Sequence, residues 1–172
     1  MSSCLLASCS TQISSYAEHT PKLVLEEFLN GHISGTGIIS NWKGEVTQQF
    51  DFEGHASWKD HICTFNETMR YDDGREDRRT WIITKINDTH YEGRTEQVIG
   101  VAKIVVQGNA MNWQYQMDIK VNNQTYRLTF DDWMYLMNNQ TLVNQNAFKK
   151  FGLTVGSLTL IMRKETDKHE KA

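Results

Sequence analysis

Cysteine and histidine are too sparse in this 172-residue chain to build a disulfide framework or a recognisable metal site. Cys4 and Cys9 lie near the start, and Cys63 stands alone in the body, so the body has no cysteine pair to bridge. The six histidines do not show the His-x3-His spacing, and the three cysteines do not show the Cys-x2-Cys spacing, that directs two ligands to one metal. We therefore expect no metal and no cofactor.

Long apolar runs and blocks of like charge are also missing. No apolar run approaches the roughly 18 residues that a membrane-spanning helix needs. The 18 basic and 21 acidic side chains are interspersed, whereas a nucleic-acid-binding protein usually carries a basic stripe. These absences predict a soluble body and argue against a nucleic-acid partner.

Proline occurs only once, while aromatic residues make up 10% of the chain. Together with many threonines, valines and isoleucines, this composition favours an ordered, β-rich protein. A chain of this length forms one domain by default and buries roughly two thirds of its unfolded surface.

The stretch from residue 108 to residue 133 gives the clearest structural signal. Odd positions from 111 to 119 are apolar or aromatic and even positions are polar, which is the period of a strand with one buried face. The alternation resumes after Asn122-Asn123, a pair that tolerates the positive φ angles of a type I′ turn. These runs predict an antiparallel hairpin. The inward side chains of its first strand are Met111, Trp113, Tyr115, Met117 and Ile119.

The chain from residue 31 onward reads as short strands separated by turn residues such as Asp73-Gly74 and Asn138-Asn139. Short connections favour neighbour-to-neighbour order, and closure removes exposed sheet edges. We therefore predict an all-β fold, a single antiparallel up-and-down, lipocalin- or calycin-like β-barrel of about 8–10 strands. The expected strands lie near 33–42, 45–53, 61–71, 77–86, 90–97, 100–107, 110–121, 124–136, 140–145 and 155–163.

A short helix is expected before the strands. Thr20-Pro21 predicts its start, with the threonine as N-cap and the proline at the first helical position. Asn30-Gly31 predicts its end. Leu25, Phe28 and Leu29 share one face at the spacing of a helix, so we expect the helix to pack on the sheet or to close one end of the barrel.

Several short motifs, taken together in order, carry a resemblance to one known family. They include Tyr71-Asp72-Asp73-Gly74, Arg79-Thr80-Trp81, Tyr91-Glu92-Gly93, Gly100-Val101-Ala102, Gly108-Asn109-Ala110, Asp131-Asp132-Trp133-Met134-Tyr135 and Lys150-Phe151-Gly152. The family that they resemble is catalogued as domain of unknown function 3833, and its members are regarded as bacterial lipoproteins with no established activity. The resemblance covers roughly residues 22 to 164 and implies export, lipid anchoring and a barrel.

The N-terminus carries Leu6-Ala7-Ser8-Cys9, which resembles a bacterial lipobox with Cys9 as the lipidated residue. Only eight residues precede Cys9 and none is basic, so either the true start lies upstream or this is an ordinary small-residue terminus. With the family resemblance we expect lipidation at Cys9, a location in the bacterial cell envelope, and an outer-membrane lipoprotein facing the periplasm. Residues 1–20 would then be signal remnant and tether, 21–164 the barrel domain and 165–172 a charged tail.

Arginines among aromatic residues are the most informative candidates for a binding site. An arginine that points into an apolar barrel must be paired or solvated, and it can bind a carboxylate or phosphate. The alternative is an outward arginine in a cross-strand ion pair, which the phase of its strand predicts for Arg127. The candidate ligand-binding residues are Arg70, Arg79, Trp81, Tyr91, Met111, Trp113, Tyr115 and Met117.

Nucleophilic chemistry has a weaker basis. Cys63 has His61 two residues away, on the same side of an extended strand, but buried cysteine within a strand is common. The glycines at 31, 35 and 37 precede a strand rather than join a strand to a helix, so we interpret them as relieving crowding rather than as a phosphate loop.

Three hypotheses follow for the function. The first is a monomeric, lipid-anchored barrel that binds a hydrophobic ligand such as a fatty acid or a membrane lipid. The second is an enzyme that modifies a lipid inside such a barrel, with Tyr, Arg or Asp in acid–base roles. The third is a filled barrel with a structural role in the envelope and no ligand.

Overall fold

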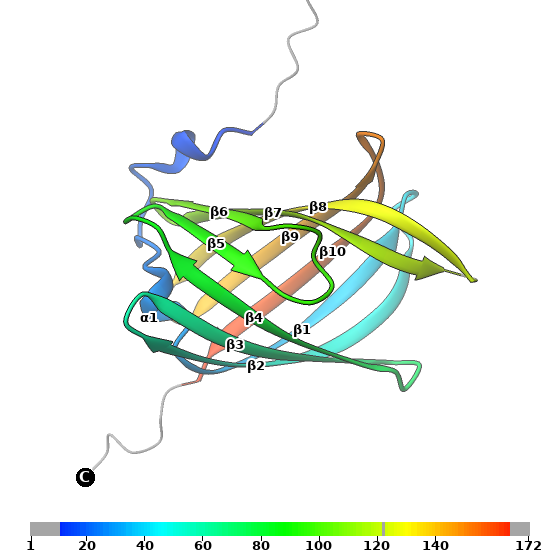
Figure 1. Ribbon diagram of the computed structural model, residues 1–172, viewed down its shortest axis with the longest axis horizontal. Coiled ribbons are helices and arrows are strands. Elements are labelled where there is room, and N and C mark those ends of the chain that lie inside the picture. Colours follow the sequence, from blue (N-terminus) through cyan, green and yellow to red (C-terminus); the bar gives the residue numbers. More distant parts are fainter. Residues whose placement is uncertain (1–10, 122, 166–172) are drawn as a thin grey trace, which may run out of the picture.

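Ten antiparallel strands close into one barrel in the computed structural model, which describes residues 11–121 and 123–165 (Figure 1). Each strand pairs with its neighbours in sequence, and β1 pairs with β10 to close the sheet. The predicted all-β, up-and-down barrel is therefore confirmed. The strands are β1 (Gly31–Asn41), β2 (Val46–Lys59), β3 (Ile62–Tyr71), β4 (Glu76–Lys85), β5 (His90–Arg94), β6 (Ala102–Gln107), β7 (Ala110–Val121), β8 (Gln124–Asn138), β9 (Thr141–Lys150) and β10 (Leu153–Lys164).

The predicted hairpin is formed by β7 and β8, with Trp113 opposite Asp132 and Tyr115 opposite Phe130. Asn122 lies outside the described residues, and Asn123 has a φ of 64°. Arg127 lies on the outer face, where its Nε donates to Asp118 Oδ1 at 2.9 Å, as its phase in the strand predicts. The period of two thus correctly assigned the faces of this hairpin.

Two strands are longer than predicted. β2 continues to Lys59 and β9 to Lys150, whereas the sequence predicts ends near 53 and 145. The inward residues that continue β2 include Gly54 and Ala56, which are too small to register as an apolar alternation. In β9 the inward positions hold polar residues, so the alternation is hidden there too.

Glycines allow close packing where β1 curves against its neighbours. A Cβ built on Gly37 would lie 2.4 Å from Phe50 Cζ and 2.7 Å from the Thr159 carbonyl oxygen. A Cβ on Gly54 would lie 2.6 Å from Phe65 Cε2. The interpretation of the β1 glycines as sites of crowding therefore agrees with the packing at Gly35 and Gly37 but is wrong for Gly31, where an added Cβ would have no atom within 4 Å and the φ of 88° favours glycine instead.

The N-terminal helix is shorter than predicted. α1 (Leu25–Phe28) is a single turn with Val24 as its N-cap and no side-chain cap, so the predicted start at Thr20-Pro21 is wrong. The backbone before it is held by the turn between β6 and β7 instead, because the Leu23 N–H donates to the Gly108 carbonyl oxygen at 2.7 Å. The predicted apolar face is buried, and α1 covers one end of the barrel (Figure 1).

The described N-terminal segment also lies at the α1 end. A 3-10 turn, η1 (Ile13–Tyr16), places the Tyr16 ring 5.4 Å from that of Tyr135 and 6.0 Å from that of Trp133. These residues of the expected tether are thus packed against the outside of the barrel. Cys9 and residues 166–172 lie outside the described residues, so the predictions made on them stay predictions.

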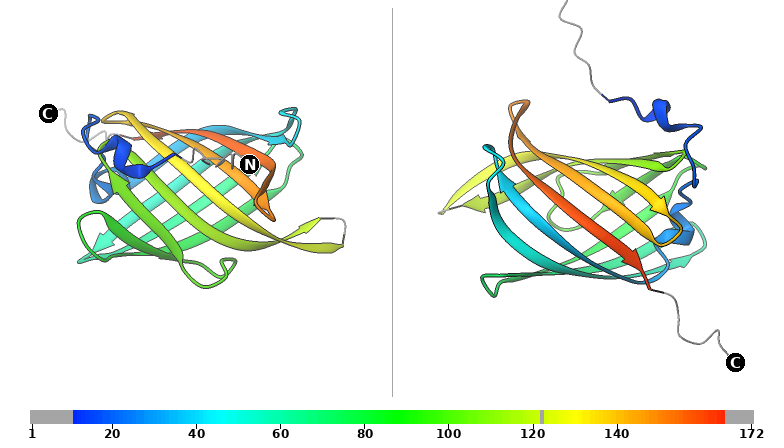
Figure 2. Two further views of the ribbon diagram at one scale, coloured as in Figure 1. Left: turned by 90° about the horizontal axis from the view of Figure 1, so that it is seen from above. Right: turned by 180° about the vertical axis from the view of Figure 1, so that it is seen from behind.

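The opposite end of the barrel carries the turns that join β1 to β2 and β9 to β10 (Figure 2). Within the described part of the chain, no helix is long and apolar enough to cross a membrane.

Candidate ligand-binding cavity

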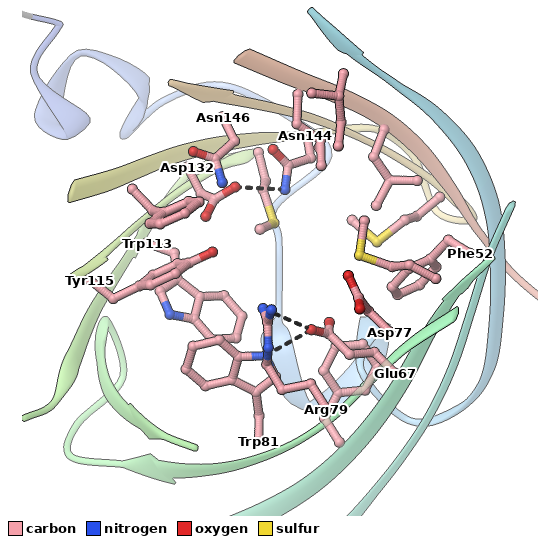
Figure 3. Close-up of a pocket in the computed structure, with 18 of the residues that line it drawn as sticks. Phe52, Glu67, Asp77, Arg79, Trp81, Trp113, Tyr115, Asp132, Asn144 and Asn146 are labelled. Atoms are coloured by element: carbon pink, nitrogen blue, oxygen red, sulfur yellow. Dashed lines mark hydrogen bonds and ion pairs between the residues drawn. The ribbon is translucent and has the colours of Figure 1, made fainter. Parts of the chain in front are cut away.

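A cavity of about 300 Å³ lies inside the barrel. Most of its wall is apolar, and polar side chains enter it from β3, β4, β7, β8 and β9 (Figure 3). It extends from α1 toward the opposite end, where Gln48 and Arg75 line it. Its apolar wall includes Leu25, Phe52, Phe65, Met69, Met111, Met117, Ile119, Leu128, Phe130, Phe148, Leu158, Leu160 and Met162.

Six of the eight predicted ligand-binding residues line this cavity. They are Arg79, Trp81, Met111, Trp113, Tyr115 and Met117. Each lies at an inward position of β4 or β7, as the alternation of its strand requires. Their role in binding stays a prediction.

The other two predicted residues do not line the cavity. Arg70 lies on the outside, where it contacts Glu53 and Glu76 at 2.9 Å each, because odd-numbered residues of β3 point inward and it is even-numbered. These carboxylates, Glu53 first, raise the pKa of Arg70. Tyr91 is buried near α1, and its hydroxyl donates to Glu26 Oε2 at 2.8 Å.

One polar pair on the wall joins β3 to β4. Glu67 and Arg79 face each other directly in the sheet, and Arg79 Nη1 lies 3.3 Å from Glu67 Oε1. Glu67 also accepts a hydrogen bond from Trp81 Nε1 at 3.2 Å. Burial raises the pKa of Glu67, and the charge of Arg79 opposes that rise. The arginine predicted to hold a ligand thus already has a carboxylate partner.

A second polar group lies across the cavity on β8 and β9 (Figure 3). The Asp132 side chain accepts a hydrogen bond from Asn144 Nδ2 at 2.9 Å and another from the Tyr115 hydroxyl. Burial raises the pKa of Asp132 to about 7, although the Asn144 and Tyr115 hydrogen bonds oppose this; Glu67 adds to the rise. A carboxyl group of this kind exchanges a proton near neutral pH.

Four side chains of the cavity wall have a buried polar atom without a hydrogen-bond partner among the described residues. Two are donors, Arg79 Nε and Trp113 Nε1, and two are acceptors, Asn144 Oδ1 and Asn146 Oδ1. Leaving a buried polar group unpaired costs about 1–3 kcal/mol. The polar part of the wall can therefore both donate hydrogen bonds to a bound group and accept them from it.

Aromatic rings connect the two polar groups. The Trp81 ring lies 4.7 Å from Trp113 and 5.4 Å from Tyr115, both edge-on. Tyr115 stacks on Phe130 at 5.0 Å. Such packing fixes ring positions, so this side of the cavity is preorganised.

Sequence reasoning did not place Asp132, Asn144, Asn146 or Glu67 among the candidate ligand-binding residues. The signal was present. Asp132 interrupts the inward series of β8 between Phe130 and Met134, and a polar residue in the buried phase of a strand needs a partner or a ligand.

The weaker nucleophile hypothesis is not supported by the geometry. Cys63 is fully buried, and burial raises the pKa of its thiol to about 11. His61 is exposed in the turn before β3, so it does not lie beside the thiol as a base. Among the residues that the structure describes, no three potential metal ligands cluster together.

A family profile described as "Protein of unknown function (DUF3833)" matches residues 3–164. The chain belongs to this family. The match agrees with the resemblance carried by the motifs, and it extends that resemblance toward the N-terminus. A comparison with curated proteins gives no match for this DUF3833 member.

Solved structures that resemble the DUF3833 barrel include one described as "Structure of S-type Phycobiliprotein Lyase CPES from Guillardia theta". The two chains are 7% identical, with a TM-score of 0.59, and the likeness covers 84% of this chain and 95% of that one. At this identity the likeness shows the fold alone. It agrees with the lipocalin-like class predicted from the sequence.

Proposed function

We propose that the barrel binds a small amphipathic molecule, with its apolar body along the methionine and phenylalanine wall. Its polar group lies between the Glu67–Arg79 pair and the Asp132–Asn144 pair. The observation that carries the proposal is the set of unpartnered buried donors and acceptors that face one another across an apolar cavity (Figure 3). A ligand that satisfies them gains hydrogen bonds for which the protein has already been desolvated.

The size of the cavity limits the ligand. About 300 Å³ is at the small end of the range for ligand pockets. Burying roughly ten methylenes releases about 8 kcal/mol, whereas association costs about 4–15 kcal/mol. The apolar body alone gives weak binding, so the polar group must contribute to the affinity.

The charges of the wall favour a neutral polar group over a free acid. Glu67, Asp77 and Asp132 place three carboxyl groups on the wall. Of the two arginines that line it, Arg79 is already paired with Glu67 and Arg75 with Asp73. A ligand carboxylate placed here would face like charge. Within the class of lipids, we therefore propose an alcohol, ester or amide rather than the fatty acid itself.

The test is a titration of the full chain with dodecanol, dodecanamide and dodecanoate, followed by tryptophan fluorescence and native mass spectrometry. Trp81 and Trp113 line the cavity, so their emission reports occupancy. At pH 8 we expect the two neutral ligands to bind at least tenfold more tightly than dodecanoate. The exchange N144L should remove much of this preference, while R70M, on the outer face, should leave it unchanged. Tighter binding of dodecanoate, or no uptake of any of the three, would overturn the proposal.

The cellular setting is a separate proposal that rests on the sequence. We propose that Cys9 is lipidated and that the protein is anchored in the bacterial envelope, as its lipobox-like motif suggests. Growth with a radiolabelled fatty acid should label the wild type and not C9A. Equal labelling of both would contradict it.

Acid–base chemistry on the bound molecule is a second candidate, favoured by one observation. The pKa of Asp132 is about 7, which suits proton transfer at neutral pH, and the Tyr115 hydroxyl lies beside it. After incubation with dodecanamide, extraction and mass analysis distinguish the two functions. A product that forms with the wild type and not with D132N favours the enzyme, and an unchanged ligand mass favours binding alone.

A further inference from the structure

Large apolar side chains are exposed at the end of the barrel opposite α1. Trp42 is 72% exposed in the turn between β1 and β2, and Phe151 and Leu153 are 95% and 73% exposed at the turn between β9 and β10. The two turns are neighbours, because β1 pairs with β10 and Asn41 lies opposite Gly156. Single exposed apolar residues are ordinary, but three on adjacent turns form a continuous feature.

One lysine lies beside each of the two aromatic rings, and Glu45, in the same turn as Lys43, accepts a hydrogen bond from Asn41 Nδ2 at 2.7 Å. The Lys43 ammonium lies 5.4 Å from the centre of the Trp42 ring, and the Lys150 ammonium lies 5.5 Å from that of Phe151. Neither lysine forms an ion pair with a described residue; Lys149, by contrast, is paired with Asp131 at 2.5 Å. We call Trp42, Lys43, Lys150, Phe151 and Leu153 the tip patch.

Another turn at this end has a different character from the tip patch. The turn between β3 and β4 holds Asp72, Asp73 and Arg75, and Arg75 is paired with Asp73 at 2.9 Å. It presents acidic side chains and no exposed large apolar one. The exposed aromatic and lysine side chains of the tip patch are therefore not shared by the β3–β4 turn.

We propose that the tip patch docks on the surface of an anionic lipid bilayer. Trp and Phe side chains are suited to the boundary between head groups and acyl chains, and lysines beside them attract anionic head groups. The whole chain has a net charge of −3, so a bilayer of like charge would repel most of its surface. The unpaired lysines at the tip select the orientation in which the patch meets the lipid.

The tip patch also lies beside the open part of the cavity. Gln48 and Arg75, which line the cavity, belong to the same end of the barrel, whereas α1 covers the other end (Figure 2). A bilayer docked on the tip patch would thus meet the barrel where the cavity approaches the surface. The docking does not depend on what the cavity binds. Because η1, four residues after Cys9, packs at the α1 end, it concerns a bilayer other than the one that a lipid on Cys9 would enter.

The test is vesicle flotation of the full chain with vesicles of phosphatidylcholine alone and with 30% phosphatidylglycerol. We expect at least fivefold more protein on the anionic vesicles, and a loss of this difference in 0.5 M NaCl. F151S/L153S should weaken binding at least tenfold. K43Q/K150Q should remove the preference for anionic lipid.

M137S is the matched control, because Met137 is 59% exposed on β8 near the α1 end, and it should bind as the wild type does. Far-ultraviolet circular dichroism of each variant checks that the barrel is intact. Equal binding by F151S/L153S, or an equal loss in M137S, would overturn the proposal. So would sedimentation showing a dimer that F151S/L153S dissociates, since the patch would then join two copies of the chain.

Discussion

Asp132 occupies a position on β8 that an apolar side chain would fill in an ordinary barrel. It lies between Phe130 and Met134 on the inward face and is 3% exposed. Burial raises the pKa of this carboxyl group to about 7, and its hydrogen bonds from Asn144 and Tyr115 only partly offset the desolvation of the charged form. A desolvated carboxyl group on the wall of a cavity points to function rather than to stability.

The raised pKa of Asp132 makes the free energy of unfolding depend on pH. Between its unfolded value of 3.8 and its folded value of about 7, the folded state keeps a proton that the unfolded state loses. Stability therefore falls as pH rises through this window, by up to about 4 kcal/mol from this group. D132N should remove the contribution of this group to the change of the free energy of unfolding with pH. At pH 8 it should unfold at a higher urea concentration than the wild type.

The neighbouring D131N tests the sign of this effect. The pKa of Asp131 is lowered, because its hydrogen bonds, chiefly from Lys149, outweigh its burial. Its contribution to stability is present above its unfolded pKa and lost as pH falls, so D131N should be less stable than the wild type at pH 8. If D132N and D131N shift the urea midpoint in the same direction at pH 8, the assignment of the two faces of β8 is wrong.

The Glu67–Arg79 pair should be strongly coupled, since its side chains are only 14% and 21% exposed. R79M leaves the Glu67 carboxyl buried without its partner, and we expect a loss of about 3–5 kcal/mol in the free energy of unfolding. The double variant E67M/R79M should recover much of that loss. Urea unfolding of the single and double variants measures the coupling.

The matched control for this pair is the outer pair of Glu53 and Arg70, which is about half exposed. The corresponding single and double variants of Glu53 and Arg70 should give a coupling free energy of less than about 1 kcal/mol. Equal coupling at the two pairs would contradict the burial of the inner one.

At the scale of the elements, the sequence predicts a strand well where inward residues are large and apolar. The β7–β8 hairpin meets that condition. β2 and β9 do not, because Gly54 and Ala56 in one and Asn144 and Asn146 in the other break the visible alternation. The length of α1 was overestimated because its local start and stop signals were good, whereas a hydrogen bond from Leu23 to the β6–β7 turn keeps the preceding backbone out of the helix. Packing and tertiary contacts, which a single sequence does not display, account for each difference.

The candidate site divides in the same way. The cavity-lining residues of β4 and β7 could be predicted from the apolar–polar alternation of each strand and from the residue types at its inward positions. The polar wall could not, because its partners come from strands far apart in sequence; Glu67 and Asp132, for example, influence each other only through the closed barrel.

The glycines of the barrel wall give a prediction at this scale. In G54A the new Cβ would meet the rings of Phe65 and Phe52, and we expect a loss of about 1–3 kcal/mol from overpacking. F65L should relieve part of it, because a leucine lacks the clashing ring atoms. G37A should not be relieved by F50L, since the Thr159 carbonyl oxygen stays 2.7 Å from the new atom. Thermal unfolding of G54A, G54A/F65L, G37A and G37A/F50L gives the comparison. Recovery of stability in G37A/F50L relative to G37A would contradict the predicted backbone clash.

At the scale of the whole molecule, closure of the sheet removes every free strand edge among the ten strands. Edge pairing, the usual route to association of β proteins, is therefore blocked, which favours the monomer proposed from the sequence. The two ends of the barrel differ in what covers them. One is closed by α1, and the other combines the open part of the cavity with the tip patch.

This polarity predicts how an apolar molecule reaches the cavity. If the tip patch holds the open end against a bilayer, N-phenyl-1-naphthylamine should pass from anionic vesicles to the protein during contact, without crossing water. Its rate of transfer should then rise in proportion to vesicle concentration, whereas transfer through water is limited by release from the vesicle and is independent of that concentration. F151S/L153S should lose this dependence while keeping the equilibrium affinity for the dye, because neither residue lines the cavity. Stopped-flow fluorescence measures the rate, with M137S as the control. If the rate of transfer to the wild type does not depend on vesicle concentration, the dye reaches the cavity through water. The tip patch would then have no part in filling the cavity.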